Sequence, residues 1–215
     1  MSLIIIFFLL LIFVINFIFY WQYYFKKRKY KQKSSQTFSH IMISTMLPIP
    51  IINSGYFDLI FKENFSYFGQ YRIGFLVMGI VFIVIGIKFR SLAFKTLNIK
   101  KIDNKQHLLK RKGIYEIARH PIYLSWILMF LGISFIFDSF IGLILCPLLT
   151  IFIELLASFE EKYILIPKFG KDYENYKKKT PNRLISQPYN YLLIIIGIFV
   201  IYIGFLNLNN FALFS

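Results

Sequence analysis

The chain has 215 residues, of which 57% are hydrophobic and 20% aromatic, with a net charge of +15 and a mean hydropathy of +0.60. Soluble domains are about half apolar or less, so this composition excludes a soluble globular domain, and the aromatic content excludes a disordered basic tail. A single cysteine excludes a disulfide-stapled module. The composition indicates a polytopic integral membrane protein. We predict an all-α fold, because a helix satisfies its own backbone hydrogen bonds in lipid.

Six apolar windows approach the length of about 20 residues that a helix needs to cross a bilayer. The second window contains Pro48 and Pro50, which a membrane helix tolerates when its neighbours satisfy the freed carbonyl groups. Basic residues follow the first window instead of preceding it, so we interpret it as a retained anchor and not as a signal peptide. The six windows are Leu3–Phe25, Ile41–Phe57, Ile73–Ile87, Ile122–Phe137, Ser139–Phe159 and the segment from Tyr189 to the C-terminus.

The distribution of basic residues predicts how these spans are oriented. Of the 25 Lys and Arg residues, 23 lie in the connections after the first, third and fifth windows, and only Lys62 and Arg72 lie on the other side. The positive-inside rule places those three connections in the cytoplasm and both termini on the non-cytoplasmic side. Because the charge lies in loops between apolar spans, we expect membrane lipids and not nucleic acid as the partner.

The connection before the fourth span ends in the sequence Arg119-His120-Pro121. Proline suits the first turn of a helix because its missing N–H would have no partner there, so Pro121 should begin the fourth helix. Arg119 and His120 would then lie at the membrane surface beside a helix N-terminus, which attracts a carboxylate or a phosphate. Alternatively, Arg119 reaches lipid phosphates and His120 only caps the helix.

Three acids lie near the cytoplasmic end of the fifth span. Glu160 and Glu161 end this span, and Glu154 lies two turns before Glu161 on the same helix face. Carboxylates are unfavourable at a helix C-terminus and inside a membrane, so the cluster is a candidate functional site. Alternatively, the acids form internal salt bridges between the fourth and fifth helices. An anion site and an acid cluster on one cytoplasmic face would suit a zwitterionic ligand with a carboxylate and an ammonium group.

The segment Lys162–Lys179 follows the acids and mixes lysines with aromatic and aliphatic side chains. A segment of this composition is expected to lie in the membrane interface. Its rings should point towards the lipid and its ammonium groups towards anionic headgroups.

Several of these motifs together resemble a known family. The first half comprises His107-Leu108-Leu109, Gly113-Ile114-Tyr115 and Arg119-His120-Pro121-Ile122-Tyr123, and the second comprises Glu160-Glu161, Phe169-Gly170, Tyr173 and Tyr176. In this order they resemble the integral-membrane methyltransferases of the isoprenylcysteine carboxyl methyltransferase and phospholipid methyltransferase superfamily. The resemblance covers about residues 105–185. It divides the chain into three transmembrane helices with basic loops (1–104), a methyltransferase core (105–186) and an additional C-terminal transmembrane helix (187–215).

The resemblance implies that S-adenosylmethionine binds on the cytoplasmic side, between the loop before the fourth helix and the end of the fifth. A lid containing Phe169, Tyr173 and Tyr176 would cover it. Arg119 and Glu161 are the implied catalytic residues, since an arginine orients a carboxylate by a bidentate contact and a glutamate meets an ammonium or sulfonium group. The implied cofactor-binding residues are His107, Leu109, Gly113, Tyr115, Arg119, His120, Pro121, Tyr123, Glu160 and Glu161.

Two features depart from the pattern of this family. Seven residues, Lys162–Lys168, separate the acidic pair from Phe169-Gly170, where the resemblance predicts six. Asn182 interrupts the usual Thr-Pro-Arg ending, so that the arginine falls at position 183, and Ser186 stands where a proline is common.

The most specific function that the resemblance implies is carboxyl O-methylation of an isoprenylcysteine-like acceptor that enters from the lipid. Arg119 or Arg183 would orient the acceptor carboxylate, which is nucleophilic at pH 7 and needs no base. A phospholipid N-methyltransferase is the first alternative, and its amine acceptor would have to lose a proton. An NADPH-dependent membrane reductase and a non-catalytic membrane scaffold or transport component are the others. We expect membrane lipids and a lipophilic methyl acceptor as partners, and no metal.

Overall fold

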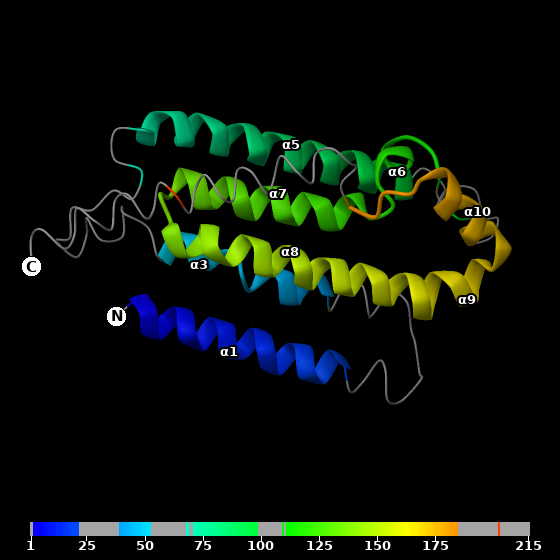
Figure 1. The fold of residues 1–215 in the computed structure, drawn as a ribbon, viewed down its shortest axis with the longest axis horizontal. Helices are drawn as coiled ribbons and strands as arrows, with labels where there is room; N and C mark the ends of the chain where they lie inside the picture. Colours follow the sequence, from blue (N-terminus) through cyan, green and yellow to red (C-terminus); the bar gives the residue numbers. More distant parts are fainter. Residues whose placement is uncertain are drawn as a thin grey trace, which may run out of the picture.

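The structure is a computed structural model that describes residues 2–21, 39–52, 68, 71–98, 109, 111–184 and 202, with the backbone alone for residues 2–6, 19–21 and 98. Every regular element within these ranges is a helix (Figure 1), as predicted. The long helices are α1 (Ser2–Trp21), α5 (Arg72–Asn98), α7 (Pro121–Ile136) and α8 (Phe140–Glu160). The shorter elements are α3 (Pro48–Ile52), α6 (Ile114–Ile117), a π-helical turn η3 (Glu161–Leu165), α9 (Ile166–Phe169) and α10 (Lys171–Lys179).

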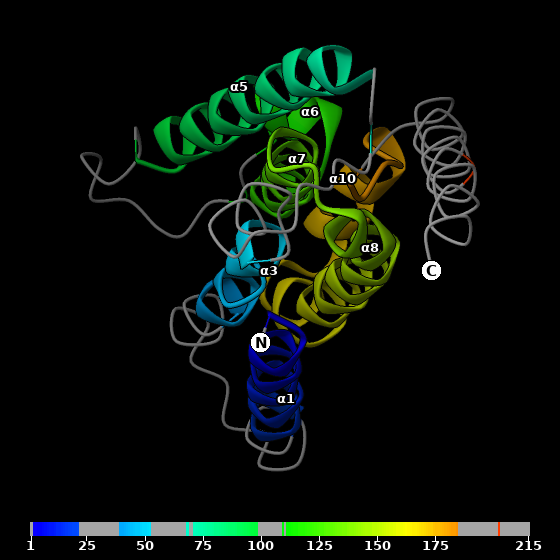
Figure 2. The same cartoon turned by 90° about the vertical axis from the view of Figure 1, so that its left-hand side faces the viewer.

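Helix α7 is the centre of the bundle. Figures 1 and 2 show that α5, α8 and α3 surround it, while α1 lies on the outside next to α3. Twelve of the 16 residues of α7 are buried, whereas α5 and α8 each keep a row of exposed apolar side chains. This is the distribution expected for helices that face other helices on the inside and lipid on the outside.

Small residues bring α5 and α7 into close contact. A Cβ atom added to Gly79 would lie 2.7 Å from the carbonyl oxygen of Gly132, and a Cβ atom added to Gly132 would lie 2.7 Å from that of Gly79. Since lipid tails are as apolar as leucine, membrane helices associate largely through such close packing. The two glycines therefore set the distance between the helix that carries Pro121 and the helix beside it.

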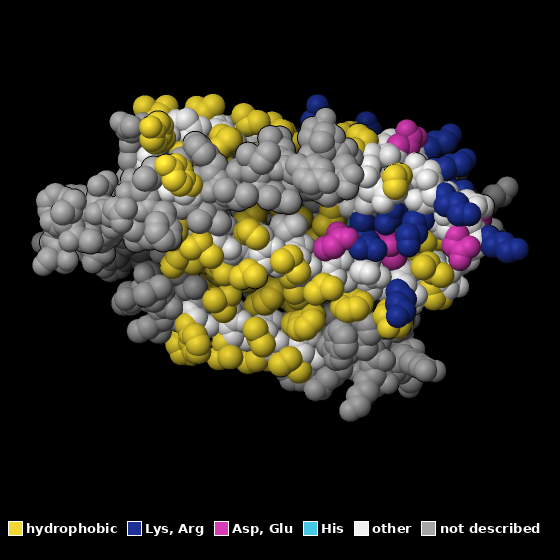
Figure 3. Space-filling view, in the orientation of Figure 1, with side chains coloured by type: hydrophobic (Ala, Val, Ile, Leu, Met, Phe, Trp, Pro, Cys, Tyr) yellow, Lys and Arg dark blue, Asp and Glu magenta, His cyan; other side chains and the backbone are white. Residues whose placement is uncertain are grey.

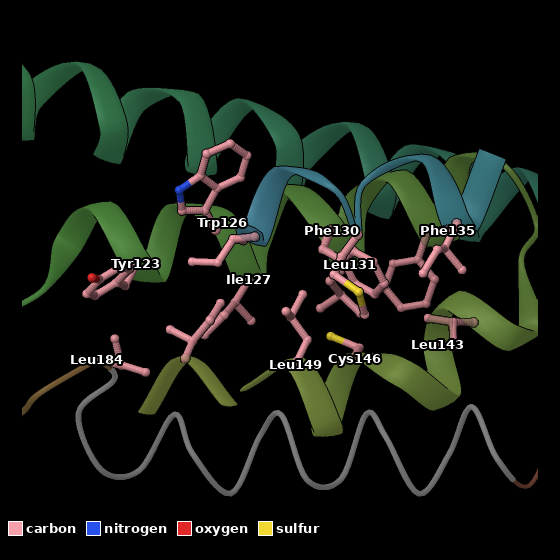
Figure 4. Close-up of a cluster of buried hydrophobic side chains, with 14 of the residues drawn as sticks. Tyr123, Trp126, Ile127, Phe130, Leu131, Phe135, Leu143, Cys146, Leu149 and Leu184 are labelled. Carbon is pink, nitrogen blue, oxygen red and sulfur yellow. The ribbon is translucent and has the colours of Figure 1, made fainter. Parts of the chain in front are cut away.

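The main apolar core lies between α7 and α8 (Figure 4). Phe130, Ile153 and Leu156 have no exposed surface, and Leu149 has almost none. The buried side chains labelled in the close-up are Tyr123, Trp126, Ile127, Phe130, Leu131 and Phe135 of α7, Leu143, Cys146 and Leu149 of α8, and Leu184.

A tight turn returns the chain from α7 to α8. Asp138 adopts a left-handed conformation with φ of 53°, which aspartate tolerates better than most residues. Its carboxylate accepts a hydrogen bond from the backbone N–H of Phe68 at 3.0 Å, and the Ser139 hydroxyl caps α8 by accepting from Gly142 N at 3.1 Å. The turn makes α7 and α8 antiparallel, so the start of α7 and the end of α8 lie at the same end of the bundle.

Two helices of the described ranges are long and apolar enough to cross a membrane, Arg72–Leu97 and Phe140–Phe169. Shorter apolar helices comprise Phe7–Ile18, Ser39–Ile52 and Pro121–Ile136. The third predicted span was too short, because α5 continues past Ile87 through Lys88 and Arg90 to Asn98. Of the sixth predicted span only Tyr202 is among the described residues.

Charged and apolar side chains occupy different parts of the surface. Figure 3 shows apolar side chains along the length of the bundle, whereas the Lys, Arg, Asp and Glu side chains in view gather at the end that carries α9 and α10. The N-terminus of α7 and the C-terminus of α8 also lie at this end (Figure 1). The predicted site residues that the structure describes are therefore located at the charged end of the bundle.

Candidate active site

The site begins at the turn that precedes α7. Gly113 has a φ of 66°, which suits glycine, and it starts the single helical turn α6. The chain then extends through Ala118 and enters α7 with Pro121 as the first helical residue, as predicted. This geometry leaves Arg119 and His120 immediately ahead of the helix, and both are buried.

Arg119 and Glu161 form a buried ion pair across 42 residues of sequence. Arg119 Nε donates to Glu161 Oε1 at 2.8 Å, and each side chain is only 3% exposed. Arg119 Nη1 also donates to the carbonyl oxygens of Thr180 at 2.7 Å and Pro181 at 2.6 Å. One guanidinium thus joins the start of α7, the end of α8 and the segment that follows α10.

His120 contacts both acids of the pair at the end of α8. Its Nε2 lies 3.2 Å from Glu161 Oε1, and its Nδ1 lies 3.8 Å from Glu160 Oε2. An ionised carboxylate can only accept, so Nε2 is the donor to Glu161. The imidazole also stacks on the ring of Tyr123 with 5.6 Å between centroids. The predicted convergence of the turn before α7 and the acids that end α8 is therefore present.

The backbone of residues 182–183 pairs with the same turn. Arg119 N donates to Asn182 O at 3.1 Å and His120 N donates to Arg183 O at 3.0 Å. These bonds satisfy two N–H groups just ahead of α7, where a helix offers no partners of its own. Asn182, which departs from the family pattern, contributes its backbone to this pairing.

Arg183 adds a second cation to the acids. Its Nη1 donates to Glu154 Oε1, and its Nη2 donates to Glu161 Oε2 at 3.3 Å. Burial acts to lower the pKa of Arg183, but the charges and hydrogen bonds of Glu161 and Glu154 outweigh it and raise that pKa. Glu154 and Glu161 share one helix face, as predicted. Both of them form internal salt bridges with Arg183.

Two tyrosines of α10 pack over the turn that begins at Gly113. Tyr173 and Tyr176 are 1% and 3% exposed, and the Tyr176 hydroxyl donates to Tyr115 O at 2.6 Å. The prediction that these two rings face the lipid is wrong, since they fill the space against Tyr115 and Ala93. The Tyr173 hydroxyl is buried without a hydrogen-bond partner among the described residues. Burial, and then the charge of Glu161, raise the pKa of Tyr173.

The π-helical turn η3 accounts for the unusual spacing after the acids. It covers Glu161–Leu165, directly between the acid pair and α9. A π turn closes i→i+5 hydrogen bonds, so it holds one residue more than the corresponding α turn. The π turn thus accommodates the seventh residue between Glu161 and Phe169 inside the helix.

The structure groups the predicted site residues as follows. Arg119, His120, Tyr123, Glu160 and Glu161 form one contiguous cluster. Leu109 and Tyr115 belong to the neighbouring apolar cluster under α10, and Gly113 precedes Ile114 of that cluster, while His107 lies outside the described residues. Within the described ranges no three His, Cys, Asp or Glu side chains are placed to hold a metal ion.

Some contributors to the site were not among the predicted residues. The carbonyl groups of Thr180 and Pro181 bind Arg119, but backbone acceptors carry no sequence signal. His40 and Arg90 lie close to Trp126 in the next layer of the bundle, and each could have been noticed as an ionisable residue at the edge of an apolar span.

Comparisons with known proteins show what this chain is similar to. Residues 72–172 match the phospholipid methyltransferase family. Three curated relatives are each named protein-S-isoprenylcysteine O-methyltransferase. The Schizosaccharomyces pombe protein is 33% identical over 119 residues, which are 55% of this chain and 50% of that protein. The Saccharomyces cerevisiae protein is 32% identical over 117 residues, 48% of this chain and 46% of that protein.

The third relative, from Xenopus laevis, is 29% identical over 122 residues, 50% of this chain and 40% of that protein. The chain thus matches half or less of the length of each of these relatives. No solved structure matches it. These matches bear out the predicted resemblance to the isoprenylcysteine carboxyl methyltransferase and phospholipid methyltransferase superfamily.

Proposed function

We propose that this protein is an S-adenosylmethionine-dependent methyltransferase that O-methylates the carboxylate of a lipidic, isoprenylcysteine-like acceptor. One observation carries the proposal: the turn before α7 and the acids that end α8 meet in a buried charged cluster. These are the two halves of the motif by which the sequence resembles the family. The names of the three curated relatives support the same reaction.

The charge of the cluster fits the proposed cofactor. Glu154, Glu160 and Glu161 carry three negative charges, and Arg119 and Arg183 carry two positive ones. The carboxylates of the cluster therefore outnumber its guanidinium groups by one. S-adenosylmethionine has one net positive charge at neutral pH, since a sulfonium and an ammonium oppose one carboxylate. Glu160 and Glu161 are the buried acids of the set, and a buried carboxylate favours a ligand of opposite charge beside it.

Each group of residues has a role in this proposal. Glu160 and Glu161 face the cationic end of the cofactor, while Arg119 and His120 hold Glu161 in place. When bound, the cofactor supplies an electrophilic methyl group on a sulfonium. The remaining proposed contacts frame it under the α10 lid, which keeps water out of an in-line displacement that depends on alignment. These contacts are His107, Leu109, Gly113, Tyr115, Pro121 and Tyr123.

We propose that the site faces the cytoplasm in a protein of six transmembrane helices with both termini on the non-cytoplasmic side. The alternation of basic connections supports this topology. So do the two long apolar helices and the gathering of charges at the end of the bundle that carries the site (Figure 3). The divisions at residues 104 and 186 remain the proposed limits of the methyltransferase core.

A phospholipid N-methyltransferase is the second candidate, because the matching family bears the name phospholipid methyltransferase. Membranes that contain the protein should be incubated with radiolabelled S-adenosylmethionine. Label in a base-labile ester supports carboxyl methylation, whereas label in a base-stable N-methyl lipid supports the second candidate and contradicts the first.

Cofactor binding is tested with the purified protein. S-adenosylhomocysteine should raise its melting temperature, NADPH should not, and Glu161→Gln should abolish the shift. Asp172→Asn is the matched control, because it changes an acid to its amide on the exposed surface, where Asp172 pairs with Arg111 at 3.2 Å. If S-adenosylhomocysteine produces no shift in the wild-type protein, the methyltransferase proposal is wrong.

A further inference from the structure

A second cluster of ionisable and aromatic groups lies next to the acid cluster. It consists of His40 in the described segment 39–52, Arg90 of α5 and Trp126 of α7. We propose that Arg90 and His40 bind the carboxylate of the methyl acceptor. The proposal rests on the proposed function and adds to it the residues that recognise the acceptor.

Arg90 is a cation without an anionic partner in the described part of the chain. Its guanidinium lies 4.3 Å from the centroid of the Trp126 ring and 5.4 Å from that of Phe94. Its Nη1 atom is buried and has no hydrogen-bond partner there. The aromatic faces stabilise the charge but leave the Nη1 donor unpaired among the described residues, and an unpaired buried donor is costly. A carboxylate satisfies both the charge and the donors, by a bidentate contact.

His40 presents a second donor. The indole Nε1 of Trp126 can only donate, and it lies 3.0 Å from His40 Nδ1. His40 Nδ1 is therefore the acceptor, so the imidazole is the neutral tautomer with its proton on Nε2. The same contact orients the indole whose face lies under Arg90. Trp126 thus contacts both proposed donors: its N–H group donates to His40, and its ring lies against the guanidinium of Arg90.

This cluster is continuous with the proposed cofactor site. The ring of Tyr123 lies 5.6 Å from the ring of His40 and 5.6 Å from that of His120, which itself contacts Glu161. Tyr123 and Trp126 lie one turn apart on α7 (Figure 4). A carboxylate held by Arg90 would therefore be next to the group that donates the methyl.

The charges on the two sides of Tyr123 match the two reactants. The acid cluster has more carboxylates than guanidinium groups, which suits a cation, and Arg90 has a positive charge for an anion. In the transfer, a carboxylate oxygen forms a bond to the methyl carbon while the carbon–sulfur bond breaks and its electron pair stays on sulfur. The products are a neutral ester and a neutral thioether. The ester offers no charge to Arg90, which favours its release.

The test compares Arg90→Gln with Arg90→Lys, using N-acetyl-S-farnesylcysteine as the acceptor probe. Arg90→Gln should raise the KM for this probe at least tenfold, and Arg90→Lys should recover part of the loss because it keeps the charge. Lys95→Gln is the matched control, since it removes an exposed cation from the same helix. The melting-temperature shift with S-adenosylhomocysteine should be unchanged in all three variants, which shows that they fold.

A binding measurement separates this proposal from the proposed function. Binding of the probe is followed by tryptophan fluorescence, which needs no methyl transfer. The wild-type protein should bind the free acid more tightly than the corresponding primary amide, and Arg90→Gln should remove this preference. If Arg90→Gln prefers the free acid over the amide as strongly as the wild-type protein does, the proposed carboxylate site is wrong. This holds whether or not the protein transfers a methyl group. A preference that depends on Arg90 in a protein that transfers no methyl group supports the site and contradicts the proposed function.

Discussion

Among single residues, Arg119 joins several separate parts of the site through its hydrogen bonds. Its guanidinium binds one carboxylate and two backbone carbonyls in a place where it is nearly inaccessible to water. A planar group with several fixed donors can meet three acceptors at once, and a lysine cannot do so with the same geometry. Arg119 therefore acts as a positioning residue for Glu161 and for the chain after α10.

Replacing only one member of the Arg119–Glu161 pair should destabilise the protein more than replacing both members. Arg119→Gln leaves the Glu161 carboxylate buried with a weaker partner and should lower the free energy of unfolding by about 3–5 kcal/mol. The double variant Arg119→Gln/Glu161→Gln leaves no orphaned charge and should lose less. Denaturation in detergent of the two single variants and the double variant checks this. A loss in the double variant equal to the sum of the two single losses would show that the two side chains are not coupled.

The two buried tyrosines of α10 give a matched comparison. Tyr176→Phe removes the hydrogen bond to Tyr115 O and should lower the stability by about 1 kcal/mol. Tyr173→Phe removes a hydroxyl without a hydrogen-bond partner in the described part of the chain, so the stability should stay the same or rise. Melting temperatures of the two variants decide between these outcomes. A larger loss for Tyr173→Phe would mean that its hydroxyl has a partner in the folded protein.

Burial also makes these tyrosines sensitive to high pH. The pKa values of Tyr115, Tyr173 and Tyr176 are all raised, chiefly by burial. In the unfolded chain they ionise near pH 10, so the folded state binds more protons above that pH. Their contribution to stability is complete below about pH 10 and is lost as the pH rises further. Melting curves from pH 8 to 11 should show this loss, and Tyr173→Phe should reduce its size.

Among the elements, the π turn η3 has the most specific consequence. It holds the extra residue between Glu161 and Phe169, so deletion of the exposed Lys162 should convert it to an α turn without moving α8 or α9. S-adenosylhomocysteine should still stabilise the deletion variant. Deletion of the exposed Leu155 inside α8 is the control, because it rotates the following acids by about 100° relative to the preceding turns. If both deletions abolish the shift, η3 does more than hold an additional residue.

Hydropathy predicted much of the helical arrangement, because a bilayer demands a long apolar run and such runs are visible in the sequence. It misplaced the end of α5, where Lys88 and Arg90 continue the helix. Lysine and arginine are good helix formers, so a charged run can end a span without ending the helix. The pairing of Arg119 with Glu161 was foreseeable from the motif order, but its bonds to the Thr180 and Pro181 carbonyls were not.

At the scale of the whole molecule, the two ends of the bundle differ in chemistry. Every proposed cofactor contact among the described residues lies at the end where α7 starts and α8 stops, and the Asp138 turn lies at the opposite end. The proposed topology requires the first end to face the cytoplasm, since α5 and α8 both end there and a predicted basic connection follows each of them in the sequence. Orientation in the membrane is therefore a property that tests the site and the topology together.

Cysteine accessibility measures this orientation. In a Cys146→Ala background, Tyr71→Cys marks the start of α5 and Lys177→Cys marks α10, and both positions are exposed. A membrane-impermeant maleimide should label Tyr71→Cys in intact cells but reach Lys177→Cys only in inverted vesicles, because the two lie at opposite ends of the bundle. The reverse pattern would place the site outside the cell and contradict the topology. Labelling of both positions from one side would mean that the described helices do not span the bilayer along their length.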